Sequence, residues 1–327
     1  MASSDNNATI DKIARPCENC GKPCKTRCSQ CKTMDFCSRE CQKDLWKTHK
    51  AFCHGIAHPT LAISEEACLA AADACSQKCL VVDGLAPGGA GCDDMTRARA
   101  QLLKCGIDVA VVDVTKCKGY FVRQLASLLH MQPPQRDECP FYPTAILVLG
   151  WGSGGIPQEW NENKDFQDAI QQWVQNGGNF LVQGERVRMC DDWPTSWFDK
   201  PWKDGDFLRT DHKCFAAGPD ATHWASDWFQ ERYVNVGNDE ESKKNRLNYN
   251  VHACMLKDVP PHETLYGSMD DDASHFVVPE MAGVPIGSGS VAVAYGKYGQ
   301  GTVSFFGDVN YEEQTLELMA VIAKGNR

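Results

Sequence analysis

The N-terminal part of the chain carries a dense set of metal-type ligands. Seven cysteines and one histidine fall between residues 17 and 53 as four pairs, each separated by two or three residues. These pairs are Cys17/Cys20, Cys28/Cys31, Cys37/Cys41 and His49/Cys53. Two ligands at such a spacing can face one ion from a knuckle or from one side of a helical turn. Eight ligands predict two tetrahedral zinc ions, which we expect to be structural because neither keeps an open position for catalysis.

The secondary structure expected around Cys41, His49 and Cys53 determines which pairs can bind the same ion. Ser38 is a good N-cap, and residues 39–53 contain no Gly or Pro, so we expect a helix there. Cys41 and His49 would then lie about 12 Å apart along the axis, too far for one ion. This predicts an interleaved arrangement, while a sharp break in the helix would allow sequential pairing instead. In the interleaved arrangement one ion is bound by Cys17, Cys20, Cys37 and Cys41, and the other by Cys28, Cys31, His49 and Cys53.

This ligand spacing, together with Phe36, Gln42 and Trp46, resembles the MYND zinc finger over residues 17–53. The resemblance implies a small two-zinc interleaved module, found in eukaryotic regulatory proteins, that binds short proline-containing peptides of partner proteins. One departure is Cys24, an extra cysteine between the first two pairs. We interpret Cys24 as a spare thiol, with an alternative zinc ligand as the other reading.

Gln42 and Trp46 share one helical face with His49 and Cys53, because steps of four and three return to the same side. Trp46 could pack over the second zinc site as the core of a very small domain. It could also form, with Gln42, a slot in which proline rings of an extended peptide stack on the indole. The resemblance favours the slot as the partner-binding site, and the two faces of one ring can serve both roles.

The whole chain has a formal net charge of −10, and this charge is divided unevenly between the finger and the remainder. Residues 1–58 hold 10 Lys/Arg and 6 Asp/Glu, against 23 and 37 in the remainder. Seven thiolates and two zinc ions bring the finger close to neutral, so we do not expect nucleic acid as a partner. DNA contact by the finger is kept as a regulatory alternative. The absence of an apolar run of roughly 18 residues and of a secretory leader predicts no membrane span and an intracellular protein, nuclear or cytoplasmic.

The pattern after the finger predicts a second, larger domain. Residues 54–78 are interpreted as a linker and a helix, and residues 79–327 as an α/β domain. Near-continuous apolar strands alternate with amphipathic helices, which predicts a mostly parallel, flavodoxin-like doubly wound sheet. Residues from about 186 to 289 show no regular pattern and are interpreted as an irregular elaboration.

The order of these elements, with "QNGGNFLVQGE" and "GQGTVSFFGD", resembles the class I glutamine amidotransferase-like fold. Active members carry a cysteine at a tight turn after a strand and a late histidine. Here the turn holds Glu185, Cys190 lies beyond it, and the stretch around Asp308 has no histidine. We therefore predict no catalytic residues and interpret the domain as a second binding unit whose small-molecule ligand is unknown. The alternative is a hydrolase or amidotransferase-like enzyme that acts in the α/β crevice.

Other motifs give weaker signals. The glycines of "GWGSGG" are not followed by a helix, as dinucleotide binding would require. Cys190 and His212 are separated by irregular chain, so we do not pair them as nucleophile and base, and "MDDDASH" fits a solvated turn. Five tryptophans gather between residues 193 and 228, where packing is the simpler explanation than an aromatic ligand platform. The sequence thus favours a zinc-binding interaction adaptor over an enzyme.

Overall fold

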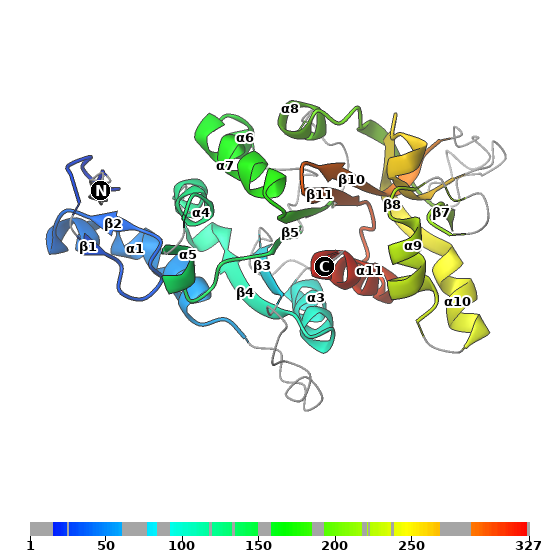
Figure 1. Ribbon diagram of the computed structural model, residues 1–327, viewed down its shortest axis with the longest axis horizontal. Coiled ribbons are helices and arrows are strands. Elements are labelled where there is room, and N and C mark those ends of the chain that lie inside the picture. Colours follow the sequence, from blue (N-terminus) through cyan, green and yellow to red (C-terminus); the bar gives the residue numbers. More distant parts are fainter. Residues whose placement is uncertain are drawn as a thin grey trace, which may run out of the picture.

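A computed structural model gives the arrangement of the chain (Figure 1). It describes residues 16–24, 26–60, 77–83, 92–117, 120–132, 135–149, 158–184, 193–217, 221, 223–236, 239–268 and 289–325. Several predictions concern segments outside these residues: most of the helix after the linker, the glycines of "GWGSGG", the turn with Glu185, Cys190 and "MDDDASH". None of the helices within the described ranges is long and apolar enough to cross a bilayer.

The finger consists of a two-stranded ribbon and one long helix. Strands β1 (Thr26–Arg27) and β2 (Asp35–Phe36) pair antiparallel. Helix α1 (Arg39–Ala57) follows, and the hydroxyl of Ser38 accepts a hydrogen bond from the Cys41 N–H, as the N-cap prediction required. The helix continues four residues past Cys53, where we expected a linker, because Gly55 and Ile56 are buried and extend its apolar face.

The larger part of the chain is built on a nine-stranded sheet with the order β4-β3-β5-β6-β11-β10-β8-β7-β9. One half is parallel and contains β4 (Asp108–Asp113), β3 (Lys78–Asp83), β5 (Ala145–Leu149), β6 (Asn179–Gln183) and β11 (Gly301–Phe306). The other half is antiparallel and contains β10 (Val291–Tyr298), β8 (Asn248–Lys257), β7 (Lys203–Cys214) and β9 (Thr264–Gly267). The prediction of a mostly parallel sheet is therefore not confirmed, since the sheet is mixed.

The stretch predicted to be irregular holds three of these strands. In β8, buried and exposed residues largely alternate, as expected of an antiparallel strand that is covered more fully on one side. The same stretch contains the helices α8 (Trp193–Phe198), α9 (Ser226–Phe229) and α10 (Glu240–Leu247), with the π-helical turn η2 (Gln230–Val234) directly after α9. These strands do not appear in the sequence as near-continuous apolar runs, because polar residues are interspersed along them.

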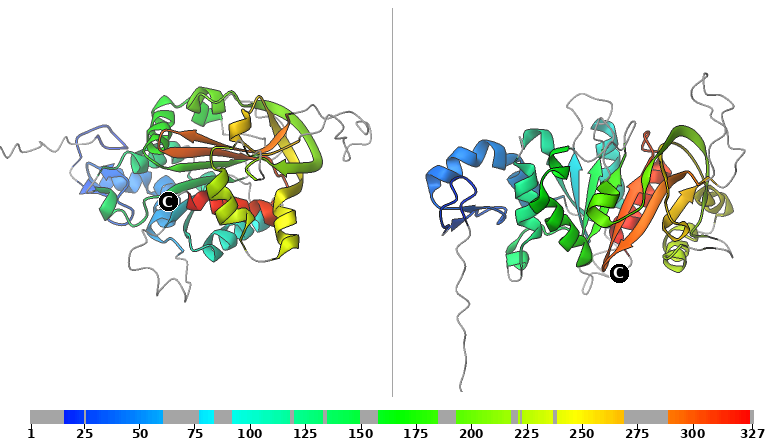
Figure 2. Two further views of the ribbon diagram at one scale, coloured as in Figure 1. Left: turned by 45° about the vertical axis from the view of Figure 1, so that its right-hand side comes forward. Right: turned by 90° about the horizontal axis from the view of Figure 1, so that it is seen from above.

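Helices cover both faces of the sheet, as Figures 1 and 2 show. On one face lie α4 (Phe121–Leu129), α6 (Gln158–Asn161), α7 (Lys164–Gln175) and α8, and the finger joins the same apolar cluster. On the other face lie α3 (Cys92–Lys104), α11 (Glu313–Lys324), α9 and α10. Trp193, Trp197 and Trp202 are buried in the first cluster, and Trp224 and Trp228 pack partly buried against the second. The tryptophans thus contribute to packing on both sides.

The finger sits at the β4 end of the sheet, where α1 packs against β4 (Figure 1). Backbone hydrogen bonds of 2.8 Å run in both directions between Thr60 and Val109 of β4. The ring centroids of Phe52 in α1 and Phe121 in α4 lie 6.1 Å apart, edge to face. Finger and sheet therefore share one continuous apolar core.

Candidate metal centres and the aromatic face beside them

The structure brings the eight predicted ligands together as two groups. In each group the ligand atoms all lie within 4.8 Å of one another. The groups are Cys17, Cys20, Cys37 and Cys41, and Cys28, Cys31, His49 and Cys53. This is the interleaved grouping that the length of the helix predicted. Cys41 and His49 lie on one continuous α1, so they cannot face the same ion.

The distances within the groups fit tetrahedral zinc. Sulfurs of two ligands at about 2.3 Å from a zinc ion lie about 3.8 Å apart in a regular tetrahedron. The Sγ–Sγ distance is 3.4 Å for Cys20 and Cys37, and 3.7 Å for Cys28 and Cys53. These sulfurs are too far apart for a disulfide, whose bond is about 2.05 Å long. Thiolates and an imidazole in this arrangement imply zinc as the cofactor.

Local structure explains how each ligand is positioned. The turn after Cys17 closes through a hydrogen bond from the Gly21 N–H to the Cys17 carbonyl. The loop between β1 and β2 is closed by a hydrogen bond from the Cys28 N–H to the Met34 carbonyl, and Lys32 takes the left-handed backbone conformation in it (φ 60°). The remaining four ligands stand just before α1 or on it, so this helix links both sites.

The two groups differ in their surroundings. In the first group Cys20 is exposed and two cysteines are half-buried, whereas all four ligands of the second group are buried. Burial alone would lower the pKa of His49, but hydrogen bonds and negative charge from Cys28 and Cys31 raise it to about 9. The second group therefore concentrates negative charge in a dry place, which a divalent cation would neutralise.

Trp46 lies on the solvent side of α1, next to the second group. Its side chain is 37% exposed, and its ring meets the ring of His49 edge-on with centroids 6.0 Å apart. Gln42, one turn earlier, is half-buried, and Leu45 points into the core. The indole therefore contacts the zinc-site histidine and still presents apolar surface to solvent.

The two ligand groups, with Gln42 and Trp46 on α1, allow the finger to be compared with known zinc fingers. Residues 17–53 match the family model of the MYND finger. The MYND finger is a zinc-dependent protein-interaction module, which supports a protein partner in general. The match covers the complete set of eight ligands and both Gln42 and Trp46. Cys24 is not in either ligand group, and its Sγ lies 3.7 Å from the Lys22 carbonyl.

Comparison with curated proteins gives no match. Similar solved structures include a β-galactosidase from the Antarctic haloarchaeon Halorubrum lacusprofundi (13% identity, TM-score 0.37), which covers 75% of this chain. This chain spans only 29% of that enzyme. A putative ThuA-like protein from Parabacteroides merdae (15%, TM-score 0.39, covering 77% of this chain and 91% of its own) and the cytoplasmic protein STM1381 from Salmonella typhimurium (12%, 0.40, 76% and 98%) are also similar. These neighbours do not confirm the amidotransferase-like resemblance.

Four buried thiols of the larger domain, Cys79, Cys117, Cys139 and Cys214, do not have the properties of nucleophiles. Burial raises the pKa of Cys79 and Cys117 to about 12, and that of Cys139 and Cys214 to about 11. A thiol with so high a pKa is almost wholly protonated at neutral pH. The structure also places His212 in the core, with Nδ1 3.3 Å from the Tyr249 carbonyl.

Asp308, the last residue of "GQGTVSFFGD", has a structural role. Its carboxylate accepts hydrogen bonds from the backbone N–H groups of Asn310 and Glu312 and from the Thr315 hydroxyl, so it fixes the turn that leads into α11.

Two contacts join the larger domain to the ligand loops of the finger. The Sγ of Cys139, in the loop after α5 (Gln135–Glu138), lies 3.7 Å from the carbonyl oxygen of the zinc ligand Cys31. The Ser127 hydroxyl of α4 donates to the carboxylate of Glu18, between the first two ligands, at 3.3 Å. The larger domain thus contacts the ligand loops of the finger directly. No spacing in the sequence indicates such a contact, because 108 or more residues separate the partners.

Proposed function

We propose that this chain is a zinc-dependent adaptor whose MYND finger binds a proline-containing segment of a partner protein between Gln42 and Trp46. The supporting observation is the exposure of Trp46 on a helix that the zinc ligands hold in place. Its indole, 37% exposed on an ordered helix, offers a rigid face on which another ring can stack. We place the protein inside the cell, in the nucleus or the cytoplasm, since its described cysteines are free thiols.

The chemistry of the slot suits an extended, proline-containing peptide. A polyproline II segment has no internal hydrogen bonds and exposes its carbonyls, so the Gln42 amide can pair with its backbone while a proline ring stacks on the indole. The edge contact with His49 limits the rotation of Trp46, which lowers the ordering cost of binding. In this proposal zinc acts through the helix that it fixes and has no chemical role in binding.

The larger domain serves as a second binding unit in this proposal. The hydrolase or amidotransferase alternative needs an activated nucleophile, and the buried thiols of Cys79, Cys117, Cys139 and Cys214 do not suit that role because their pKa values are raised.

Substitution of Trp46 tests the slot. An array of proline-centred peptides identifies a ligand for the full zinc-loaded chain, and isothermal titration then compares the native protein with Trp46→Ala and Gln42→Ala. We expect Trp46→Ala to weaken binding at least about 30-fold, the effect of removing an aromatic hot spot, and Gln42→Ala to weaken it less.

Lys47→Ala is the matched control, because Lys47 is the exposed neighbour of Trp46 on α1. Each variant must retain two zinc ions per chain by elemental analysis. Unchanged peptide affinity in a zinc-loaded Trp46→Ala protein would show that the slot does not bind the partner.

A further inference from the structure

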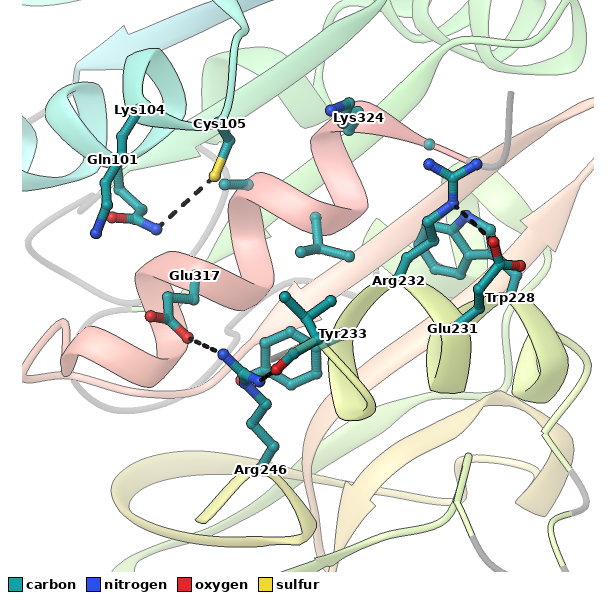
Figure 3. A pocket seen from close by; sticks show the side chains of 14 residues that line it. Gln101, Lys104, Cys105, Trp228, Glu231, Arg232, Tyr233, Arg246, Glu317 and Lys324 are labelled. Atoms are coloured by element: carbon teal, nitrogen blue, oxygen red, sulfur yellow. Dashed lines mark hydrogen bonds and ion pairs between the residues drawn. The ribbon is translucent and has the colours of Figure 1, made fainter. Parts of the chain in front are cut away.

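A cavity of about 540 Å³ lies on the face of the sheet opposite the finger's apolar cluster (Figure 3). Its walls come from the end of α3, from α9 and η2, from α10 and from α11. Cys105, just before β4, and Gly325, which packs on the first residue of β6, form part of its lining. The cavity is therefore at the amino-terminal edge of the parallel strands. Doubly wound sheets usually bind ligands at the opposite edge, so this is a separate site.

Positive charge gathers around this cavity. Its walls carry four cations, Lys104, Arg232, Arg246 and Lys324, and only two carboxylates, in a chain with a formal net charge of −10. The two lysines are exposed and form no ion pair with any residue that the structure describes. Each lies in the last turn of its helix, where the helix dipole accepts a cation. The helix dipole accounts for a lysine at the end of each helix. It does not account for the presence of both lysines in the lining of one cavity.

The two arginines are only loosely paired. Arg232 lies 3.7 Å from the Glu231 carboxylate, and Arg246 lies 3.8 Å from Glu317, both longer than a charge-assisted hydrogen bond. The Arg246 side chain is only 17% exposed. Its Nη1 donates to the Val236 carbonyl at 2.5 Å, and its guanidinium lies over the Tyr233 ring, 5.4 Å from the centroid. Arg246 is thus held in place with donors still available, which suits the binding of an anion.

The remaining wall is apolar. Trp228, Tyr233, Ala320 and Val321 contribute to it, and Val236 stands beside them with 50% of its surface exposed. Within the described part of the chain, only Val236 and Trp46 are large apolar residues exposed to this degree. Trp46 is assigned to the peptide slot, which leaves Val236 as apolar surface next to a group of cations.

We propose that this cavity binds a small amphipathic anion, with one carboxylate or phosphate head group among the cations and an apolar body against Val236, Trp228 and Val321. A volume of about 540 Å³ falls within the roughly 300–1,000 Å³ of small-molecule sites. The larger domain then contributes a binding activity of its own, independent of the finger.

Three ligands that share one apolar body test the proposal: decanoate, decyl phosphate and neutral decanol. Each is titrated into the full zinc-loaded chain, the two anions below their critical micelle concentrations and decanol below its solubility limit. Calorimetry should show one saturable site for decanoate, decyl phosphate or both, and the stronger of the two identifies the head group. Decanol should bind at least 10-fold more weakly. Equal affinity for decanol and both anions, or no saturable binding of either anion, would overturn the proposal.

Charge reversal locates the site. The double variant Lys104→Glu/Lys324→Glu should lose at least 10-fold in affinity for the anion. The matched control is Arg123→Glu/Lys244→Glu, which changes the net charge equally at exposed positions of α4 and α10 outside the cavity lining and should retain it. If the first variant fails to fold, Lys104→Gln and Lys324→Gln remove the charges singly. Undiminished anion binding in all folded cavity variants would place the anion elsewhere.

This test is separate from that of the peptide slot. Trp46→Ala should leave decanoate or decyl phosphate binding unchanged, and Lys104→Glu/Lys324→Glu should leave peptide binding unchanged.

Discussion

His223 uses both nitrogens of its ring in the folded chain. Its Nδ1 accepts a hydrogen bond from the Ala225 N–H at 3.1 Å, and this assigns the proton to Nε2, which donates to the Tyr295 carbonyl at 3.2 Å. The residue is 4% exposed, and burial lowers its pKa to about 4. Protonation of Nδ1 would direct a second hydrogen at the Ala225 N–H. The folded protein therefore stabilises neutral His223.

This predicts a specific loss of stability in mild acid. An unfolded histidine has a pKa of about 6.5. Between pH 6.5 and about pH 4, this histidine is therefore protonated in the unfolded chain and neutral in the folded chain. The free energy of unfolding should therefore fall as the pH is lowered, by up to about 1.4 kcal/mol per unit from this group. Urea denaturation between pH 7 and pH 5 measures the slope.

His223→Gln provides the comparison, because glutamine can donate and accept but does not titrate. The variant is expected to be less stable at pH 7, yet to lose less stability as the pH falls. Zinc ligands take up protons in both proteins, so only the difference between the two slopes reports on His223. Parallel slopes would show that His223 does not titrate as proposed.

Single residues also show what could be predicted from sequence. The zinc ligands could be identified because tetrahedral coordination demands particular residue types at short spacings. Arg246 and Lys324 could not, because the cavity collects residues from segments near 101, 228, 246 and 317, and a single arginine or lysine has no distinctive spacing.

At the scale of elements, the contact between α1 and β4 determines where the finger sits. Gly55 allows the helix to approach the strand closely. A Cβ at this position would lie 2.3 Å from the carbonyl oxygen of Val111 and 3.0 Å from a methyl carbon of Val112. Because the Val111 oxygen belongs to the backbone of a paired strand, it has little room to move.

We therefore expect Gly55→Ala to destabilise the protein by about 1–3 kcal/mol, although alanine is the better helix former by about 1 kcal/mol. Urea denaturation at pH 7 measures the change. Lys47→Ala, at an exposed position of the same helix, should stay within about 0.5 kcal/mol of the native protein. A Gly55→Ala protein as stable as the native one would mean that α1 does not pack this closely.

The elements differ in how well the sequence predicted them. Strands β3 to β6 are buried on both faces and appear as unbroken apolar runs, so they were identified. Strand β7 contains Asp, Lys, Arg and His, and its pairing with β8 supplies the stabilising contacts that its composition does not indicate. The end of α1 was placed too early because the ligand pattern stops at Cys53, while the helix continues to pack on the sheet.

For the whole molecule, the shared core makes the second zinc site part of the stability of the sheet. Its ligands His49 and Cys53 lie on α1 within two turns before Gly55 and Ile56, which pack against β4. The ligands of the first group are more exposed than those of the second. The two sites should therefore differ in their effect on the larger domain.

We predict that Cys31→Ser lowers the melting temperature of the whole chain by at least about 5 °C and speeds hydrogen exchange at Val109, whose N–H donates to the Thr60 carbonyl. Cys20→Ser should affect exchange in the finger and leave β4 protected. Both variants lose one zinc ligand, so each serves as the control for the other. If β4 kept its native protection against exchange in both variants, the stability of the sheet would not depend on the second zinc site.

The uninterrupted course of α1 has one more consequence. A finger on a loose tether would rotate independently, but here α1 continues from the zinc ligands into the core beside the sheet, so the finger must rotate together with the larger domain. A partner held beside Trp46 would therefore stand at a set distance and angle from everything on the larger domain. Such a finger would fix the orientation of a bound partner as well as contribute to its affinity.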